Sequence, residues 1–316
     1  MRSRLHRIII AALFLLVAAG AGVCALAADV LVVSSSEADA YQETISSLRD
    51  RLSGASPGAT VRVMQHADYV AFGPGPSRML VAVGSRATDE VLRDPRVNPI
   101  PVLSILLPRE SFEQLASSAP ERTRATTSAI YLDQPVPRQL ALITTALPEW
   151  TRIALLSGPE SAVLANEIAA EAGRLGLTVV PAQLHSERDL YAALRLTLKQ
   201  PAALIALPDR EIFNSHTIQN ILLTSYRLRS PLIGFSPSYV RAGALLAVYS
   251  TPTQIGAQAA EASAAFLTNG ALPAPAYPTD FTVGINPTVA RSLGIQLESP
   301  AAIEAVLRQL ESENDR

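Results

Sequence analysis

The chain has 316 residues, with 26 Lys or Arg against 28 Asp or Glu, which gives a formal net charge of −2 at pH 7. This balance leaves no basic excess to neutralise phosphates, so we expect no nucleic acid as a partner. The length exceeds that of a usual single domain and favours two lobes.

The amino terminus is typical of a secretory signal peptide. Three arginines precede an apolar run from Ile8 to Ala19, and a small-residue ALA segment follows at 25–27. The apolar run is too short for a membrane anchor. We therefore expect residues 1–27 to be a signal peptide that is cleaved after Ala27, and the mature protein to be periplasmic.

Cys24 is the only cysteine, and a lipoprotein would use such a residue as its first mature position. The sequence before it differs from a lipoprotein signal, since Val23 directly precedes it and Ala21 stands where Leu is usual. We therefore expect no lipid anchor. Cleavage after Ala27 would remove three arginines and no acid, leaving a net charge of −5 and no cysteine for a disulfide.

The first half alternates apolar runs with helical patterns. A segment FGPGPS at 72–77 cannot be helical, because prolines remove backbone donors and glycines favour turns. Helices are expected over about 38–52 and after Ser85, and strands at 29–35, 60–66, 79–84 and 100–107. This βαβ series favours a right-handed parallel sheet.

The second half repeats the scheme. Between the halves, residues 126–143 change from extended to helical at Pro135 and Pro137, as expected where a chain crosses between lobes. A capped helix at 299–310 is followed by a charged tail, ESENDR, that we expect to fray. The other expected elements are strands at 152–158, 177–184, 203–209, 231–237 and 243–250, and helices at 159–176, about 190–199 and about 213–227.

Three expected helix starts carry the spacing of a capping box. In each, a hydroxyl residue precedes Glu or Gln by three positions: Ser34 with Glu37, Ser157 with Glu160, and Thr251 with Gln254, where Pro252 adds a first-turn proline. Either the hydroxyls only satisfy free helical N–H groups, or several helix N-termini together face a cleft and bind a carboxylate or another polar ligand.

Enzyme signatures are incomplete. The segment GFSPS at 234–238 is similar to a nucleophile elbow, but Pro237 lacks the N–H that would donate to the oxyanion, and no histidine follows His216 to complete the triad order. His66, His185 and His216 show no metal-ligand spacing, and phosphate-binding glycine motifs are missing. We therefore predict no enzymatic activity, no metal and no cofactor.

Three segments carry a resemblance to a known family: SPSYVRAGAL at 236–245, IGAQAA at 255–260 and INPTVARSLG at 285–294. Over about 126–300 the chain resembles the ABC transporter substrate-binding family of the type I periplasmic-binding-protein fold. The resemblance implies an α/β fold with two Rossmann-like lobes, joined by three crossings, that close on a ligand. It places 28–130 plus about 247–272 in lobe 1, and 131–246 plus about 273–316 in lobe 2.

The resemblance also implies ligand-binding positions. Carried over position by position, these are strand ends and crossing residues: Ser34, Ser35, Ser85, Tyr131, Asp133, Ser157, Ser161, Asp209, Phe235 and Ser236. Some relatives are associated with aromatic amino acids. The single tryptophan, Trp150, precedes a strand instead of following one, which disfavours carbohydrate. Either Tyr131, Phe235 and Tyr239 clasp a planar or apolar side chain, or each simply packs between sheet and helix.

These features predict a monomeric periplasmic protein that captures a small polar solute. The solute could be an amino acid or a small carboxylate, and the protein would deliver it to an inner-membrane ABC permease. The alternatives are a sensor that passes ligand occupancy to a membrane receptor, and a scaffold that binds nothing. A permease and an ATPase encoded beside it would favour the first function.

Overall fold

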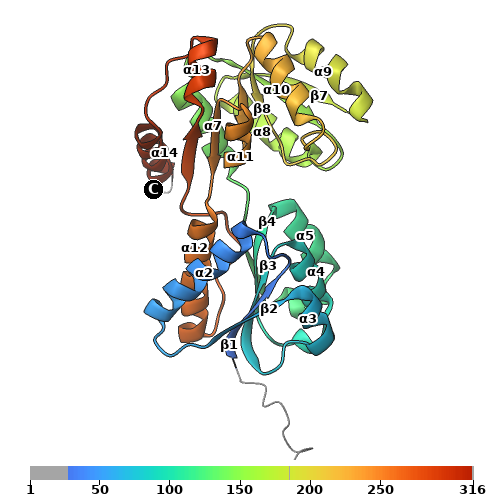
Figure 1. Cartoon of the computed structure of the whole chain (residues 1–316), viewed down its shortest axis with the longest axis vertical. Helices are drawn as coiled ribbons and strands as arrows, with labels where there is room; N and C mark the ends of the chain where they lie inside the picture. The colour runs from blue at the N-terminus through green and yellow to red at the C-terminus, as the bar shows by residue number, and fades with distance from the viewer. Residues whose placement is uncertain (1–27, 185, 315–316) are drawn as a thin grey trace, which may run out of the picture.

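The structure, a computed structural model, describes residues 28–184 and 186–314 and has two lobes stacked along its longest axis (Figure 1). The expected signal peptide, with Cys24 and the cleavage site at Ala27, lies outside the described residues, as does His185. Within the described ranges no helix is long and apolar enough to cross a membrane.

The first lobe is built on a five-stranded parallel sheet. Its strands are β1 (Ala28–Ser34), β2 (Val61–Gln65), β3 (Ser77–Val83), β4 (Val102–Leu107) and β5 (Thr127–Tyr131), in the order β2-β1-β3-β4-β5. The central strands are runs of Val, Leu and Ile that are buried on both faces, as a parallel sheet covered by helices requires. Those helices are α2 (Asp39–Ala55), α3 (His66–Phe72), α4 (Ser85–Arg93), η1 (Pro95–Val97), α5 (Arg109–Ser118) and α6 (Glu121–Arg124).

The second lobe is built on a six-stranded sheet. Its strands are β6 (Arg152–Ser157), β7 (Thr178–Gln183), β8 (Ala203–Ile205), β9 (Leu232–Gly234), β10 (Leu246–Tyr249) and β11 (Thr282–Ile285), in the order β11-β10-β9-β8-β6-β7. The pairing is parallel except between β10 and β11. Its helices are α7 (Val136–Ala146), α8 (Ala162–Arg174), η2 (Glu187–Asp189), α9 (Leu190–Thr197), α10 (Ile218–Arg227), α11 (Pro237–Ala242), α13 (Pro287–Leu293) and α14 (Pro300–Asn314). The predicted α/β fold with two parallel-dominated sheets is confirmed.

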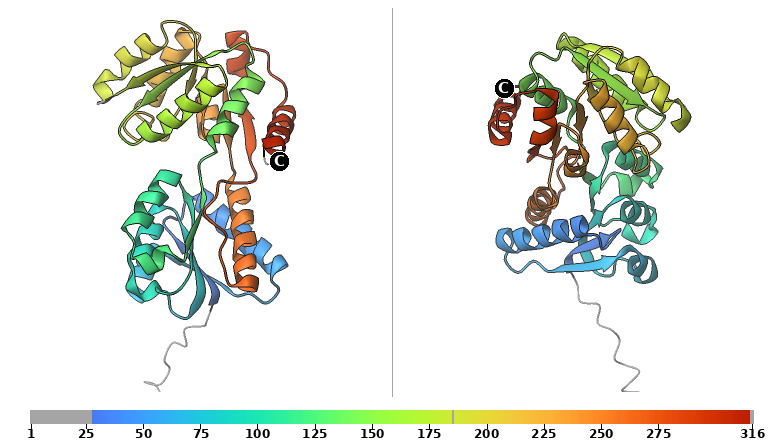
Figure 2. Two further views of the ribbon diagram at one scale, coloured as in Figure 1. Left: turned by 180° about the vertical axis from the view of Figure 1, so that it is seen from behind. Right: turned by 45° about the horizontal axis from the view of Figure 1, so that its top comes forward.

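One helix from late in the chain returns to the first lobe. Helix α12 (Pro252–Asn269) lies beside α2 in both views of Figure 2, and its residues Ile255, Ala259 and Phe266 belong to the first core. The two helices approach closely at Gly256, where an added Cβ would collide with the backbone oxygen of Thr44. Glycine at this position therefore sets the spacing of α2 and α12.

We propose that the chain crosses between the lobes three times, with two of the crossings at positions other than the expected bounds. Position 247 lies inside β10, a strand of the second sheet, so that crossing falls between β10 and α12. Position 273 lies beside β5, where the hydroxyl of Ser128 donates to the Pro273 carbonyl and the Ala276 backbone bonds to β5. We therefore propose that the third crossing follows Tyr277.

The capping box expected at Thr251 is confirmed. The Thr251 hydroxyl accepts from the backbone N–H of Gln254 at 3.2 Å, and the Gln254 side chain accepts from the Thr251 N–H at 2.7 Å. Pro252 occupies the first turn, as predicted. The start of α12 is thus fixed by local sequence.

The boxes expected for Ser34 with Glu37 and for Ser157 with Glu160 are wrong. Helices α2 and α8 each begin five residues after the serine, because the two serines are still the last residues of β1 and β6. The Ser34 hydroxyl instead donates to the carbonyl of Ser36 at 2.7 Å and stabilises the turn between strand and helix.

The helix at the carboxyl terminus is longer than expected. Helix α14 does not end at residue 310 but continues through Asn314, and Glu311 binds the guanidinium of Arg138 in α7. The acidic part of the tail is therefore a helical turn anchored to the second lobe.

Candidate ligand-binding site

The carboxyl edges of the two sheets face one another. The strands of the first lobe rise from the amino-terminal end of the chain toward the second lobe (Figure 1). Arg109 begins α5, at the carboxyl end of β4, and contacts Glu167 in α8 of the other lobe. Burial and the negative charges of Glu160 and Asp209 across this space raise the pKa of Glu110. Ligands of open α/β sheets bind at such edges.

The three serines of the first lobe have different environments. Ser34 is fully buried and bonded within its own turn. The Ser35 hydroxyl accepts from the backbone N–H of Ala87 at 2.8 Å and so caps α4 from a neighbouring strand end. Gly84 has a φ of +87°, and a Cβ there would lie 2.8 Å from the Ser35 hydroxyl. Ser85, which begins α4, is exposed at the edge.

Tyr131 and Asp133 lie at the first crossing. The ring of Tyr131 packs edge-on against Tyr277, with centroids 5.2 Å apart, and lies 5.9 Å from Phe112. The Asp133 carboxylate accepts from the backbone N–H of Arg109 at 2.5 Å. Burial raises the pKa of Asp133 above its ordinary value. Both residues thus connect the crossing to the start of α5.

In the second lobe, Asp209 holds two strand ends together. Its buried carboxylate accepts from the Ser161 hydroxyl at 2.8 Å and from the Gly158 N–H at 3.2 Å, both after β6. It also accepts from the backbone N–H groups of Glu211 and Ile212 in its own turn. With four protein donors, Asp209 and Ser161 shape the edge more than they offer free polar groups. Ser157, also buried, ends β6 within this cluster.

Phe235 and Ser236 follow β9 at the same edge and are half-buried. The Phe235 ring packs at a tilt of 45° against Tyr239, with centroids 4.6 Å apart, and the Tyr239 hydroxyl donates to the Phe213 carbonyl at 3.1 Å. Burial raises the pKa of Tyr239 to about 12, so its hydroxyl stays protonated and donates. Ser236 precedes α11 with no capping bond from its side chain. This aromatic pair and Ser236 provide a surface suited to a planar or apolar group.

Sequence reasoning missed Arg109 and Tyr277, which join the crossings. Arg109 donates to the Tyr277 hydroxyl at 2.9 Å. Arg109 had a usable signal, because it follows Pro108 directly after an expected strand and so lies at a sheet edge. Tyr277 lies in an irregular segment that pairs with β5, and no local sequence pattern predicts this pairing.

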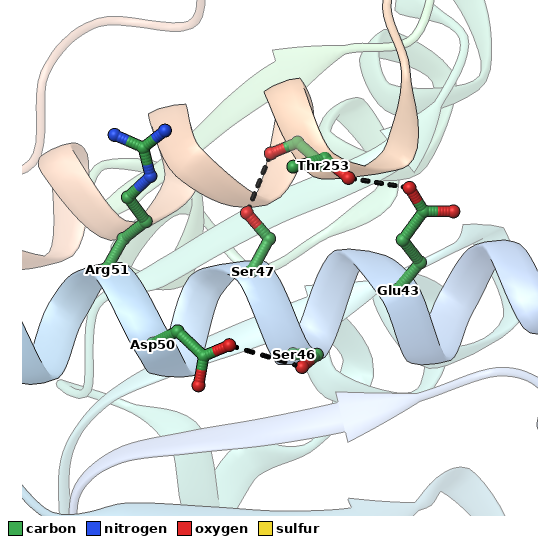
Figure 3. Close-up of a pocket in the computed structure, with 6 residues that line it drawn as sticks. All are labelled: Glu43, Ser46, Ser47, Asp50, Arg51 and Thr253. Atoms are coloured by element: carbon green, nitrogen blue, oxygen red, sulfur yellow. Dashed lines mark hydrogen bonds between the residues drawn. The ribbon is translucent and has the colours of Figure 1, made fainter.

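Two surface hollows lie away from these residues. One, of about 390 Å³, lies on the side of the first lobe between α2 and α12, where Ser47 donates to the Thr253 carbonyl at 2.7 Å and Thr253 donates to Glu43 at 2.6 Å (Figure 3). The other, of about 410 Å³, borders Asp29 and Arg78 at the amino edge of the sheet. Both are open, and neither includes a residue of the candidate site. Among the described residues no group of three His, Cys, Asp or Glu could hold a metal ion.

Comparison with known proteins gives a family match. The sequence model of the family described as ABC transporter substrate binding protein matches residues 128–307, more than half of the chain. None of the curated proteins matches.

Several solved structures have the same fold, and each aligns with this chain over almost the whole of its own length. They include an ABC domain in complex with L-Trp from Streptococcus pneumonia (16% identical, 86% of this chain and 96% of that one, TM-score 0.59). A conserved domain protein from Vibrio cholerae is 20% identical over 88% of this chain and 97% of that one, with a TM-score of 0.60. The ligand-free, open structure of a substrate-binding protein with adhesive properties from Clostridium difficile is 13% identical (85% and 96%, TM-score 0.69). At these identities the likeness establishes the fold.

Proposed function

Because this chain belongs to the ABC transporter substrate-binding protein family, we propose that it is the solute-binding component of an importer. It captures a small polar solute between its two lobes and delivers it to an inner-membrane ABC permease. Its role is binding and not catalysis.

The observation that carries this proposal is the arrangement of the sheet edges. Two separate sheets, parallel except for the β10–β11 pair, direct the carboxyl ends of their parallel strands toward a common space. Three crossings beside that space leave the lobes able to rotate about it. Closure of such lobes on a ligand converts binding energy into a change of shape that a permease can recognise.

The proposed contacts divide into two groups. Ser85, Phe235 and Ser236 supply surface to the ligand, because their side chains are only partly covered. The remaining predicted positions hold the edges in shape. Hydrogen bonds within the protein do so at Ser34, Ser35, Asp133, Ser161 and Asp209. Tyr131 does so by ring packing and Ser157 by its burial at the end of β6. The half-buried Phe235 ring favours a ligand with a planar or apolar part.

We propose an amino acid or a small carboxylate as the ligand class. The structural neighbour that holds L-Trp supports this choice. The exposed start of α4 beside Ser85 adds backbone donors and the positive end of a helix, which suit a carboxylate. The protein is a periplasmic monomer that meets its permease at the inner membrane, and the expected signal peptide supports the periplasmic location.

Isothermal titration against a panel of amino acids and small carboxylates tests this function. For a ligand that binds, Phe235→Ala should weaken affinity about 10- to 100-fold, because it removes one buried aromatic contact. Phe72→Ala is the matched control, since Phe72 is 76% exposed at the far end of α3. The Phe72→Ala variant should bind the ligand with the affinity of the wild type.

Two outcomes would count against the proposal. A panel without any binding isotherm would remove the amino-acid and small-carboxylate class. Equal affinity in the Phe235→Ala and Phe72→Ala variants would place the ligand away from the β9 edge.

A further inference from the structure

Arg109 connects the first lobe to the second. It begins α5, and its Nη2 donates to Oε1 of Glu167, in the middle of α8, at 2.6 Å. Its Nη1 donates to the Tyr277 hydroxyl at 2.9 Å, and its backbone N–H donates to Asp133 at 2.5 Å. One residue of lobe 1 is thus attached to a lobe 2 helix and to two of the crossings.

The bond to Glu167 differs from the other contacts between the lobes. Within residues 28–184 and 186–314, it is the one ion pair whose members lie in helices packed on different sheets. Hydrogen bonds elsewhere between the lobes involve residues at the crossings, such as Gln134 with Ser250 and Gln254 with Thr282. Those bonds lie at the pivot, whereas α8 moves with the second sheet.

Arg109 is held on the lobe 1 side. Phe112 and Tyr131 pack with their ring centroids 5.9 Å apart and fix the first turn of α5 against β5. Rotation of the second lobe therefore moves Glu167 relative to the Arg109 guanidinium. The guanidinium cannot follow Glu167 without breaking its hydrogen bond to the Tyr277 hydroxyl.

We infer that the Arg109–Glu167 pair is an interlobe latch that fixes the angle between the lobes observed in this structure. The N–H···O bond must break or be redirected before the angle changes. The side chains are 26% and 38% exposed, so solvent screens part of the attraction. The latch should change the ratio of lobe arrangements about two- to fivefold, as one partly exposed ion pair allows.

The nearest other charge is that of Glu113, one turn further along α5, with its Oε1 3.7 Å from Nε of Arg109. It is 59% exposed and lies in the same helix as Arg109. It therefore moves with lobe 1 and cannot take over the latch, although it competes for the guanidinium when Glu167 is removed.

The latch can be measured without a ligand, by the distance between two spin labels. Cys24 is the only natural cysteine, so a Cys24→Ser background of the full chain leaves the labels unique. Labels at Arg51→Cys in α2 and Leu196→Cys in α9 use exposed helix positions of the two lobes. With Arg109 and Glu167 both present, the distribution of distances between the two labels should be narrow. It should broaden as the salt concentration is raised, because salt screens the ion pair.

Glu167→Gln should broaden or shift this distribution at low salt and remove its salt dependence. Glu171→Gln is the matched control, because Glu171 lies one turn along the same helix and bonds Arg174 within that helix. It should leave the distribution unchanged. Arg109→Gln removes the bond to Glu167 and also the bond to Tyr277, so its effect should be at least as large as that of Glu167→Gln. Adding Glu167→Gln to Arg109→Gln should change nothing further, because the bond between the two residues is then already absent.

Identical distributions in the Glu167→Gln and Glu171→Gln proteins would overturn the latch, as would additive effects of the two latch substitutions. Thermal unfolding of each variant shows whether it is folded before the distances are compared. Because no ligand is present, failure of the latch leaves the proposed solute binding intact, and absence of solute binding leaves the latch measurable.

Discussion

Oε1 of Glu311 lies 2.5 Å from Nε of Arg138, a residue 173 positions earlier in the chain. Arg138 is only 5% exposed, and its Nη1 also donates to the Gln134 side chain at 2.7 Å and to the Pro278 carbonyl at 2.9 Å. Its guanidinium stacks on the Phe281 ring at 4.3 Å. The last helix thus neutralises a buried cation beside two of the crossings.

Glu311→Ala should destabilise the protein by about 2 kcal/mol, because Arg138 would keep its charge but lose its only carboxylate partner among the described residues. Urea unfolding followed by circular dichroism measures this change. Glu313→Ala is the control, since Glu313 is exposed and contacts Gln309 in the same helix. Equal unfolding midpoints for the two variants would argue against the anchoring role of α14.

Gly256→Ala should destabilise the first lobe by about 1–3 kcal/mol, because the new methyl group would press against the Thr44 carbonyl and force α2 and α12 apart. Thermal unfolding gives the magnitude. Gly54→Ala, also in a helix, has no atom within 4 Å of the new Cβ and should instead be neutral or stabilising by about 0.5–1 kcal/mol. Loss of stability in both variants would mean that the helix contact is not the cause.

Asp209→Ala should destabilise the second lobe by about 3 kcal/mol, because it leaves buried donors of Gly158 and Ser161 without their acceptor. Denaturant unfolding checks the change, with the exposed Asp189→Ala as control. If Asp209 were instead mainly a ligand contact, the Ala variant would retain its stability and lose only solute affinity.

Much of the fold is predictable because the central strands are buried on both faces. Runs such as DVLVVSS at 29–35 and GALLAVYS at 243–250 have no polar residue in their middle. The first overlaps β1 and the second contains β10. The short α3 was missed because no apolar period marks it. Its single buried side chain, Tyr69, is identified only by its tertiary bond to Asp94 at 2.8 Å.

The candidate site was less predictable, because its bonds join distant residues. Asp209 stands alone in sequence, and its partner Ser161 is 48 positions away. Arg109 and Glu167 are 58 positions apart, and each alone looks like an ordinary charge on a helix surface. Ligand contact at Phe235 and Ser236 stays a prediction, since their exposure is compatible with it but does not require it.

The position of α12 also determines when the first lobe can mature. The five strands of its sheet are complete at Tyr131, but Ile255 and Phe266, which fill one side of its core, are synthesised more than a hundred residues later. Until α12 is synthesised, the apolar core residues that it covers are exposed to solvent in the nascent lobe. We expect a polypeptide that stops before Ser250 to aggregate, and the whole protein to depend on chaperones while it is being made.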